Sequence, residues 1–419
     1  MTTKFEKSLQ KYAELTVRVG VNLRAGQRLL IRGPMGYGVP HSLKPLVHYL
    51  AEAAYKAGAR FVDVMWGDDQ LELLRYKYAP RDSFDEFPLW KGTGPADYCR
   101  RGDAILTISA TNPDLLAGQD PELVAASTTA AYKGIKELLD STSRNDVNWC
   151  VIAGARADWA SKIFPKLTPE KAEAKLWDAI FRMCRVDRDD PVAAWQEHVR
   201  DLTSRSKYLN GRQYTALKYT APGTDLTIGL PKGHLWLAAR ALAHNGVEFT
   251  ANLPTEEVFT LPDLRRADGV VAATKPLNHA GVLIEDFSVT FKDGRAVEVK
   301  AKKGEATLKK MIETDEGAAR LGEVALVPNS SPISQSGLMF YNTLFDENAS
   351  CHIALGKAYK FTLQGGTEMS DEEFAARGGN GSLIHVDFMI GSGEMNIDGI
   401  TESGGAEPIM RKGEWAFKV

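Results

Sequence analysis

The sequence predicts an α/β protein with two domains: an N-terminal α/β domain with a mainly parallel sheet, and a C-terminal α+β domain with a mixed sheet. Three observations predict this class. The 419 residues exceed what one ordinary hydrophobic core organises. Helical and strand-like segments alternate through the first third, which is typical of parallel pairing. The second half instead carries a β-hairpin signature and several short strand candidates.

The N-terminal domain is predicted over residues 1–200. Phe5, Leu9 and Tyr12 repeat at helical spacing and indicate an opening amphipathic helix. The apolar run 28–33 then predicts a buried strand that ends at Gly33-Pro34. Further candidates follow in order: a helix over 43–56, and strands over 61–66, 104–108 and 149–154. Residues 168–208 are predicted to be helical, with a break at Pro191, and to lead into the second domain.

The C-terminal domain is predicted over residues 201–419. Apolar residues alternate on both sides of Asp293-Gly294, which predicts a hairpin over 289–299. A helix is expected over 306–321, followed at once by a strand that Glu323 opens. Two more strands are expected over 352–361 and 382–390.

Composition and charge exclude several classes of protein. Hydrophobic residues make up 44% and charged residues 25%, which excludes a disordered chain. The net charge is −3, with no basic stripe, so a nucleic-acid partner is not expected. No run approaches the roughly 18 apolar residues of a membrane helix, so no membrane partner is expected either.

The redox state and the compartment are predicted from local features. The charged start, Met1-Thr-Thr-Lys, has no apolar core and is not typical of a secretory signal. The four cysteines are scattered and are expected to be reduced thiols. We therefore expect a cytoplasmic protein.

The common nucleophile and phosphate motifs are absent: the sequence has no GxSxG, GxxxxGK[ST] or HExxH segment. Four histidines lie on predicted helices or their ends, without an acidic partner at ligand spacing, and are interpreted as surface or packing residues: His41, His48, His198 and His244. His234 and His279 lie in glycine-containing loops, where they could line a pocket, although most loop histidines have no such role.

His385 and Asp387 form a different pattern, because they lie within the apolar segment 383–390. On a strand the side-chain period is two, so both groups point to one face. A buried imidazole and carboxylate require a partner, and a metal ion would satisfy both. A simple His–Asp hydrogen bond is the alternative, and for an isolated pair this alternative is favoured.

Three further residues strengthen the metal hypothesis. His352 opens a second apolar strand, Glu323 opens a third, and Glu257 follows Pro254 before an apolar stretch. Two imidazoles and three carboxylates can hold two divalent ions about 3.5–4 Å apart if one carboxylate bridges them. Without thiolates, the donor set suits zinc, cobalt or manganese.

Three long segments, 252–260, 344–356 and 384–392, resemble the aminopeptidase T and aminopeptidase S family of metallopeptidases. The resemblance extends to the N-terminal half through segments 25–31 and 53–59. It implies hydrolysis of the N-terminal peptide bond of short peptides by a water that two metal ions activate. It also implies a homodimer whose active site faces an internal cavity.

The resemblance implies specific roles for six residues. The metal-binding positions are Glu257, Glu323, His352, His385 and Asp387, and Tyr359 occupies the active-site tyrosine position, as an oxyanion donor or a further metal ligand. The ligand is assigned to Glu257 by its position in the motif. Many relatives have glycine at the preceding position, where this chain has Glu256, and Glu256 is the fallback.

Two other functions remain open at this point. A mononuclear-iron dioxygenase of related fold cleaves hydroxylated pyridine rings and requires only a triad such as His352, His385 and Asp387. Glu257 and Glu323 would then be superfluous, so their presence favours the two-metal peptidase. A non-catalytic binding protein would be marked by loss of a ligand, and none is missing.

Overall fold

The computed structural model describes residues 3–279 and 282–419. The chain divides into two compact units, the first containing Met1–His198 and Arg240–Pro254, the second Val199–Ala239 and Thr255–Val419. The domain division into 1–200 and 201–419 stays a prediction, and the two units differ from it in the segment 240–254.

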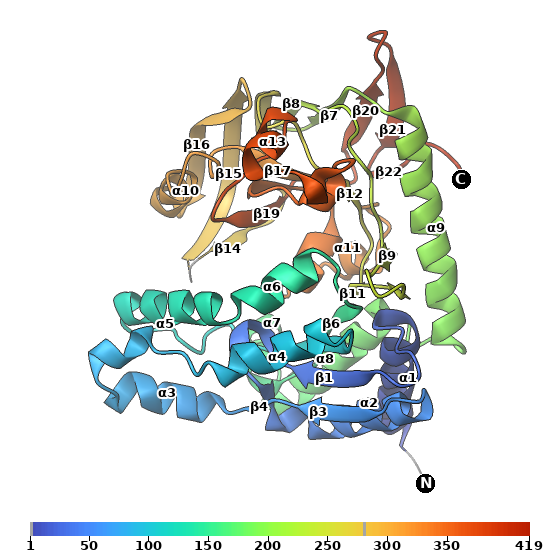
Figure 1. Ribbon diagram of the computed structural model, residues 1–419. Helices are drawn as coiled ribbons and strands as arrows, with labels where there is room; N and C mark the ends of the chain where they lie inside the picture. The colour runs from blue at the N-terminus through green and yellow to red at the C-terminus, as the bar shows by residue number, and fades with distance from the viewer. Residues whose placement is uncertain (1–2, 280–281) are drawn as a thin grey trace. The chain divides into compact units, whose positions relative to one another are not determined.

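A five-stranded parallel sheet forms the centre of the first unit, with the strand order β11-β6-β5-β1-β3 (Figure 1). This confirms the α/β class and the parallel pairing predicted from the alternating pattern. The strands are β1 (Arg28–Arg32), β3 (Phe61–Val64), β5 (Ala104–Ser109), β6 (Trp149–Ala153) and β11 (Asn252–Leu253). Two short pairs accompany them: β2 (Val39–Pro40) with β4 (Trp66–Gly67), and β9 (Ala241–Leu242) with β10 (Glu248–Phe249).

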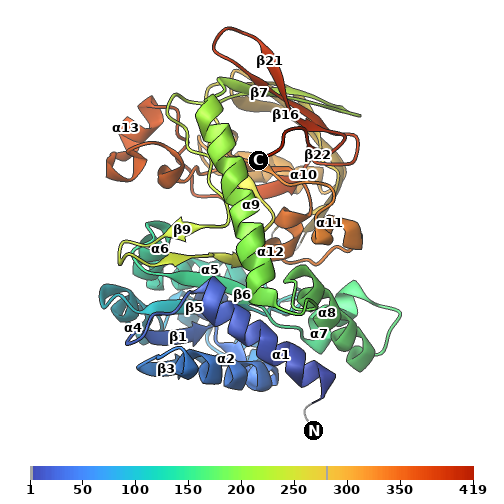
Figure 2. The same cartoon turned by 90° about the vertical axis from the view of Figure 1, so that its right-hand side faces the viewer.

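Eight helices of the first unit are described: α1 (Lys4–Leu15), α2 (Lys44–Lys56), α3 (Asp69–Tyr78), α4 (Trp90–Arg100), α5 (Pro121–Gly134), α6 (Lys136–Ser143), α7 (Ala157–Ile163) and α8 (Pro169–Met183). The first helix begins with a capping box, in which Thr3 and Glu6 each accept the other's backbone N–H. The predicted helical region 168–208 is two helices, α8 and α9 (Pro191–Arg212). Proline is suited to the first turn, where its missing N–H has no partner to lose, so α9 begins at Pro191. Figure 2 shows this long helix.

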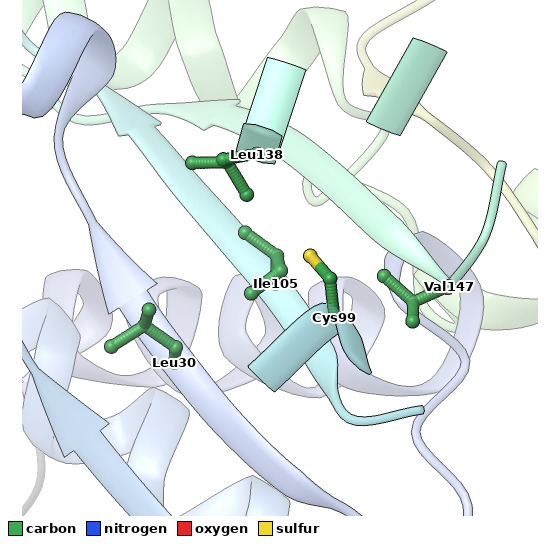
Figure 3. Close-up of a cluster of buried hydrophobic side chains, with 5 residues drawn as sticks. All are labelled: Leu30, Cys99, Ile105, Leu138 and Val147. Carbon is green, nitrogen blue, oxygen red and sulfur yellow. The ribbon is translucent and has the colours of Figure 1, made fainter. Parts of the chain in front are cut away.

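One face of the parallel sheet packs against α4 and α6 through a buried cluster (Figure 3). Leu30 of β1 and Ile105 of β5 lie opposite each other in register and share this face. Cys99 of α4, Leu138 of α6 and Val147 complete the cluster. The apolar strand residues therefore fix these two helices on the sheet by burial of apolar surface.

The second unit contains a nine-stranded sheet with antiparallel pairing. Its strands are β7 (Ala216–Ala221), β8 (Thr224–Gly229), β13 (Ala267–Ala272), β14 (Leu277–His279), β15 (Val282–Lys292), β16 (Arg295–Lys303), β20 (Asn396–Ile400), β21 (Ala406–Arg411) and β22 (Glu414–Trp415). The predicted hairpin is β15–β16, and it turns at Asp293 and Gly294, both with positive φ.

A second, four-stranded antiparallel sheet has the order β12-β17-β18-β19. Its strands are β12 (Val258–Thr260), β17 (Leu321–Leu326), β18 (His352–Gly356) and β19 (His385–Met389). Four short helices complete this unit: α10 (Glu305–Ile312), α11 (Pro332–Ser336), α12 (Thr343–Asp346) and α13 (Asp371–Ala376). Phe287 of β15 and Phe388 of β19 pack with ring centroids 5.4 Å apart, so the two sheets meet face to face here.

The helix predicted over 306–321 was too long, because α10 ends at Ile312. Beyond it, the Asp315 carboxylate accepts the N–H of Ala318 and closes a turn instead of continuing the helix. The next strand, β17, starts at Leu321, so Glu323 is its third residue. The prediction that Glu323 opens this strand was wrong by two residues.

Among the described residues, the structure contains no helix with the length and apolar character to cross a membrane. All four cysteines are buried.

Candidate metal centre

The four-stranded sheet gathers the predicted ligands on one of its faces. Across the sheet, Glu323 of β17 lies opposite Ala354 of β18, and Ala354 lies opposite Asp387 of β19. On β18, Gly356 and His352 each lie two residues from Ala354 and therefore on the same face of the sheet. Gly356 lies opposite His385 of β19. Directly opposed residues of antiparallel strands share a face, so these side chains converge.

A β-bulge places Glu323. The register between β17 and β18 shifts between Leu321 and Glu323, with Gly322 as the extra residue. A Cβ at Gly322 would lie 2.3 Å from the carbonyl oxygen of Gly356, so only glycine fits this close approach of two backbones. The bulge turns the Glu323 carboxylate to the same face as the two histidines.

The Pro-Thr-Glu-Glu segment is held by a buried asparagine. The Oδ1 of Asn348 accepts the backbone N–H of Glu256 at 2.7 Å, and Asn348 is fully buried. Of the two adjacent glutamates, Glu257 brings its carboxylate to the cluster of His352 and Glu323. The geometry therefore favours Glu257 over Glu256, the fallback.

The five residues form two groups that share one carboxylate. Nε2 of His352 lies 3.5 Å from Oε2 of Glu257 and 3.5 Å from Oε1 of Glu323. Nε2 of His385 lies 3.8 Å from Oε2 of Glu323 and 3.4 Å from Oδ1 of Asp387. In each group the ligand atoms lie within 4.8 Å of one another. Glu323 thus faces each imidazole with a different oxygen, as a bridging carboxylate does.

Both imidazoles are oriented by backbone carbonyls. Nδ1 of His352 lies 3.2 Å from the carbonyl oxygen of Ser350, and Nδ1 of His385 lies 2.7 Å from that of Lys357. A carbonyl accepts only from a protonated nitrogen, so each ring carries hydrogen on Nδ1 and directs Nε2 at the carboxylates. Metal-binding histidines typically have this arrangement.

The cluster concentrates negative charge in a buried place. Burial raises the pKa of Glu257 to about 7, and the charges of Glu323 and Asp387 add to this effect. Burial would lower the pKa of His352 and of His385, but the facing carboxylates raise both to about 10. Burial alone would raise the pKa of Asp387, but the two imidazoles, His385 foremost, together with a backbone hydrogen bond, lower it. The carboxylates therefore demand positive charge between them.

The residues fit divalent metal ions on two grounds. Oε2 of Glu257 and Oδ1 of Asp387 are buried and have no hydrogen-bond partner, although imidazole nitrogens lie 3.4–3.5 Å away. Those separations are too long for good hydrogen bonds, but they suit two atoms that bind the same metal ion. The donors are imidazole nitrogens and carboxylate oxygens, which suit zinc, cobalt and manganese.

Glu347 is a functional candidate that the sequence reasoning did not select. It lies in a 3-10 turn, Glu347–Ala349, five residues before His352. Burial, and then the charges of Glu257 and Asp387, raise its pKa well above the usual range. Its Oε1 accepts from Nδ2 of Asn348 at 3.3 Å. The signal in the sequence was the acidic segment 346–348, whose turn was not predictable from periodicity.

Tyr359 lies beside the cluster. Its ring centroid is 4.9 Å from that of His385 and 5.1 Å from that of Phe361, with which it stacks at 9°. Burial, and then the charges of Glu323 and Asp387, raise the pKa of Tyr359 well above its usual value. The hydroxyl therefore retains its proton in this environment and can act as a donor.

The loop histidines lie elsewhere in the structure. His234 is buried, with Nδ1 3.0 Å from the carbonyl oxygen of Pro231. His279 ends β14, and its following neighbours Ala280 and Gly281 lie outside the described residues. Within the described ranges, neither histidine belongs to the two ligand groups.

Comparisons with known proteins agree along the whole chain. A family model described as thermophilic metalloprotease (M29) matches residues 5–415. The chain is 48% identical over 413 residues to aminopeptidase AmpS of Bacillus subtilis, covering 99% of both proteins. It is 44% identical over 411 residues to aminopeptidase T of Thermus thermophilus, covering 98% of this chain and 99% of that protein.

Two solved structures are similar to this one. Wild-type AmpT from Thermus thermophilus matches with a TM-score of 0.92 and 44% identity, over 99% of this chain and 100% of that chain. A 2,5-dihydroxypyridine dioxygenase from Pseudomonas putida matches with a TM-score of 0.50 and 11% identity, over 99% and 97%. The second likeness shows a shared fold alone. Since the family model and the full-length relatives agree, this chain belongs to the thermophilic metalloprotease (M29) family.

Proposed function

We propose that the protein is a two-metal aminopeptidase that hydrolyses the N-terminal peptide bond of short peptides. The observation that carries this proposal is the sharing of Glu323 between two ligand groups, each with its own imidazole. The family membership and the aminopeptidase names of the full-length relatives support it.

The ligands divide into two sets with Glu323 common to both. Glu257, Glu323 and His352 would hold one divalent ion, and Glu323, His385 and Asp387 the other. Zinc, cobalt and manganese all match these donors. When bound, such a pair of ions lowers the pKa of a water molecule and polarises the scissile carbonyl.

Side chains around the cluster would handle protons and the oxyanion. Glu347 has its Oε1 fixed by Asn348, and bound cations would lower its raised pKa, so that its carboxylate would accept the proton of the attacking water. Tyr359 would donate its hydroxyl hydrogen to the tetrahedral oxyanion. A carboxylate of the cluster would bind the free amine of the substrate, and this explains selectivity for unblocked N-termini.

The two rival functions are less well supported. A mononuclear dioxygenase would use His352, His385 and Asp387 and has no need of Glu257 or of a shared Glu323. A non-catalytic protein has no reason to retain two complete ligand groups.

Activity assays with defined metals test the proposal. The protein is stripped with a chelator, reloaded with zinc, cobalt or manganese, and offered leucine p-nitroanilide, unblocked dipeptides and the same dipeptides N-acetylated. We expect metal-dependent release from the unblocked substrates alone. His385→Ala should abolish turnover in a folded protein, while His244→Ala, on an exposed histidine, serves as the matched control. Absence of metal-dependent release in the wild type would refute the aminopeptidase function.

The assembly and compartment are also proposals. The family resemblance supports a homodimer, which light scattering on the purified protein tests. The four free cysteines support a cytoplasmic location, where thiols stay reduced, and fractionation of the source cells tests it.

A further inference from the structure

The parallel sheet of the first unit has a topological switch point at β1. The strand that follows in sequence within this sheet, β3, pairs with one side of β1, and β5 pairs with the other. The strands that follow β1 in the chain therefore lie on opposite sides of it. In open α/β sheets, ligands bind outside the carboxyl ends of the strands at such a point.

Arg32 is the last residue of β1, at this carboxyl end. Arg32 is only 4% exposed, and its Nε and Nη2 are buried without a hydrogen-bond partner. These two nitrogens form one edge of the guanidinium, the fork that donates two parallel hydrogen bonds to a carboxylate. The unsatisfied donors thus match one particular kind of acceptor.

The Arg32 guanidinium also has no opposite charge beside it. Within the residues that the structure describes, it forms no ion pair. Burial lowers its pKa to about 10, and the Cys99 thiol is the group that opposes this effect. A buried cation without a counterion is costly, so an anion from outside the unit would be strongly favoured.

A cavity with room for a small ligand lies next to the residues that follow Arg32. Thr107 of β5 lies opposite Arg32 in register, on the same face, and is partly exposed. Beyond Arg32, Met35, Gly36 and Tyr37 line a cavity of about 570 Å³. Arg32 is not among the residues that line it, but segment 33–38, which follows Arg32 in the chain, supplies these three lining residues.

Both nitrogens are shielded from solvent, so an anion reaches the fork only after a local movement, for which the adjoining segment 33–38 is suited. This segment contains two consecutive residues with positive φ, Met35 at 52° and Gly36 at 78°. The first is a non-glycine residue in the left-handed region, which stores backbone strain. Displacement of this segment would release that strain.

We propose that Arg32, at the end of β1 and next to segment 33–38, binds the carboxylate of a small ligand at the switch point of the first unit. A carboxylate carries one charge, which one guanidinium balances, whereas a phosphate dianion would keep an uncompensated charge in the buried site. Pro34 also lacks the backbone N–H that phosphate-binding loops use.

Thermal unfolding and calorimetry of the metal-loaded protein test this site. Acetate is titrated against chloride at constant ionic strength, in the wild type, Arg32→Met, Arg32→Lys and His385→Ala. We expect a saturable rise in Tm with acetate in the wild type and in His385→Ala, because the metal centre is not the site. The rise should vanish in Arg32→Met. In Arg32→Lys, which keeps the cation but loses the fork, the Kd for acetate should rise at least tenfold.

Each contrary outcome refutes the proposal. It fails if acetate gives no saturable response, or if Arg32→Met responds as the wild type does. Loss of the response in His385→Ala would assign acetate to the metal centre instead. A response to inorganic phosphate that acetate does not reproduce would reject the carboxylate class. Should Arg32→Met fail to fold, Arg32→Lys still decides through the Kd.

Discussion

Glu323 and Ala354 lie directly opposite each other on neighbouring antiparallel strands, β17 and β18. On its other side, Ala354 lies opposite Asp387 of β19. The Ala354 methyl group thus occupies the sheet position between Glu323, which belongs to both ligand groups, and Asp387, which belongs to one. Because this side chain is small, it leaves space above the sheet in which metal ions could lie between the carboxylates.

Enlarging Ala354 should therefore remove metal binding without removing the fold. In Ala354→Leu, the added atoms enter the space between Glu323 and Asp387, and we expect metal affinity to fall by about 10–100-fold or more. Metal content per chain, measured by mass spectrometry of the metal, checks this. Ala354→Ser is the matched control, because it adds one small atom and should retain both ions. Normal metal content in Ala354→Leu would contradict the position assigned to the ions.

Glu323 and Glu257 should differ in the number of ions they control. Because Glu323 belongs to both groups and Glu257 to one, Glu323→Gln should lose both ions and Glu257→Gln only one. Equilibrium dialysis against zinc gives the stoichiometry. The two substitutions are matched in size and charge, so equal losses would show that Glu323 is not shared.

Tyr359→Phe should reduce turnover and keep the metal. The substitution preserves the stacking on Phe361 and removes the hydroxyl. If the hydroxyl donates to the oxyanion, kcat should fall by about 10²–10³-fold, as for other oxyanion donors. Metal content should stay at the wild-type value. A parallel loss of metal would assign Tyr359 as a ligand instead.

Asp315 should stabilise the fold in a pH-dependent way. Its carboxylate accepts the N–H of Leu383 at 2.7 Å and the hydroxyl of Ser382 at 2.9 Å, just before β19. Burial alone would raise the pKa of Asp315, but these bonds lower it, with Leu383 contributing most. The folded-state pKa is thus below the unfolded value, so the stabilisation is full above about pH 4 and is lost as pH falls through the folded-state pKa.

Asp315→Asn tests this stabilisation. We expect the variant to lose about 1–2 kcal/mol of unfolding free energy at pH 7, with the difference shrinking toward pH 3. Urea unfolding at both pH values measures it, with the neighbouring exposed Glu313→Gln as control. A difference that does not depend on pH would show that the carboxylate charge is not the cause.

Local patterns predicted those parts of the fold that depend on near neighbours in the chain. The parallel sheet of the first unit follows from alternating helical and apolar segments, and the β15–β16 hairpin follows from Asp293-Gly294. The shared face of His385 and Asp387 follows from the period of a strand. Each of these features depends on residues that are close together in the chain, so a short window of sequence is enough to predict it.

The sequence by itself determined which residue types gather in the second unit, and the tertiary structure decided how they meet. The bulge at Gly322 turns Glu323 toward the histidines, and Asn348, far along the chain, holds the backbone at Glu256. Glu347, next to Asn348, lies where the charges of Glu257 and Asp387 act on it, and strand order leaves Arg32 at a switch point. Register, bulges and strand order arise from pairing between distant segments, and their energies are absent from any local pattern.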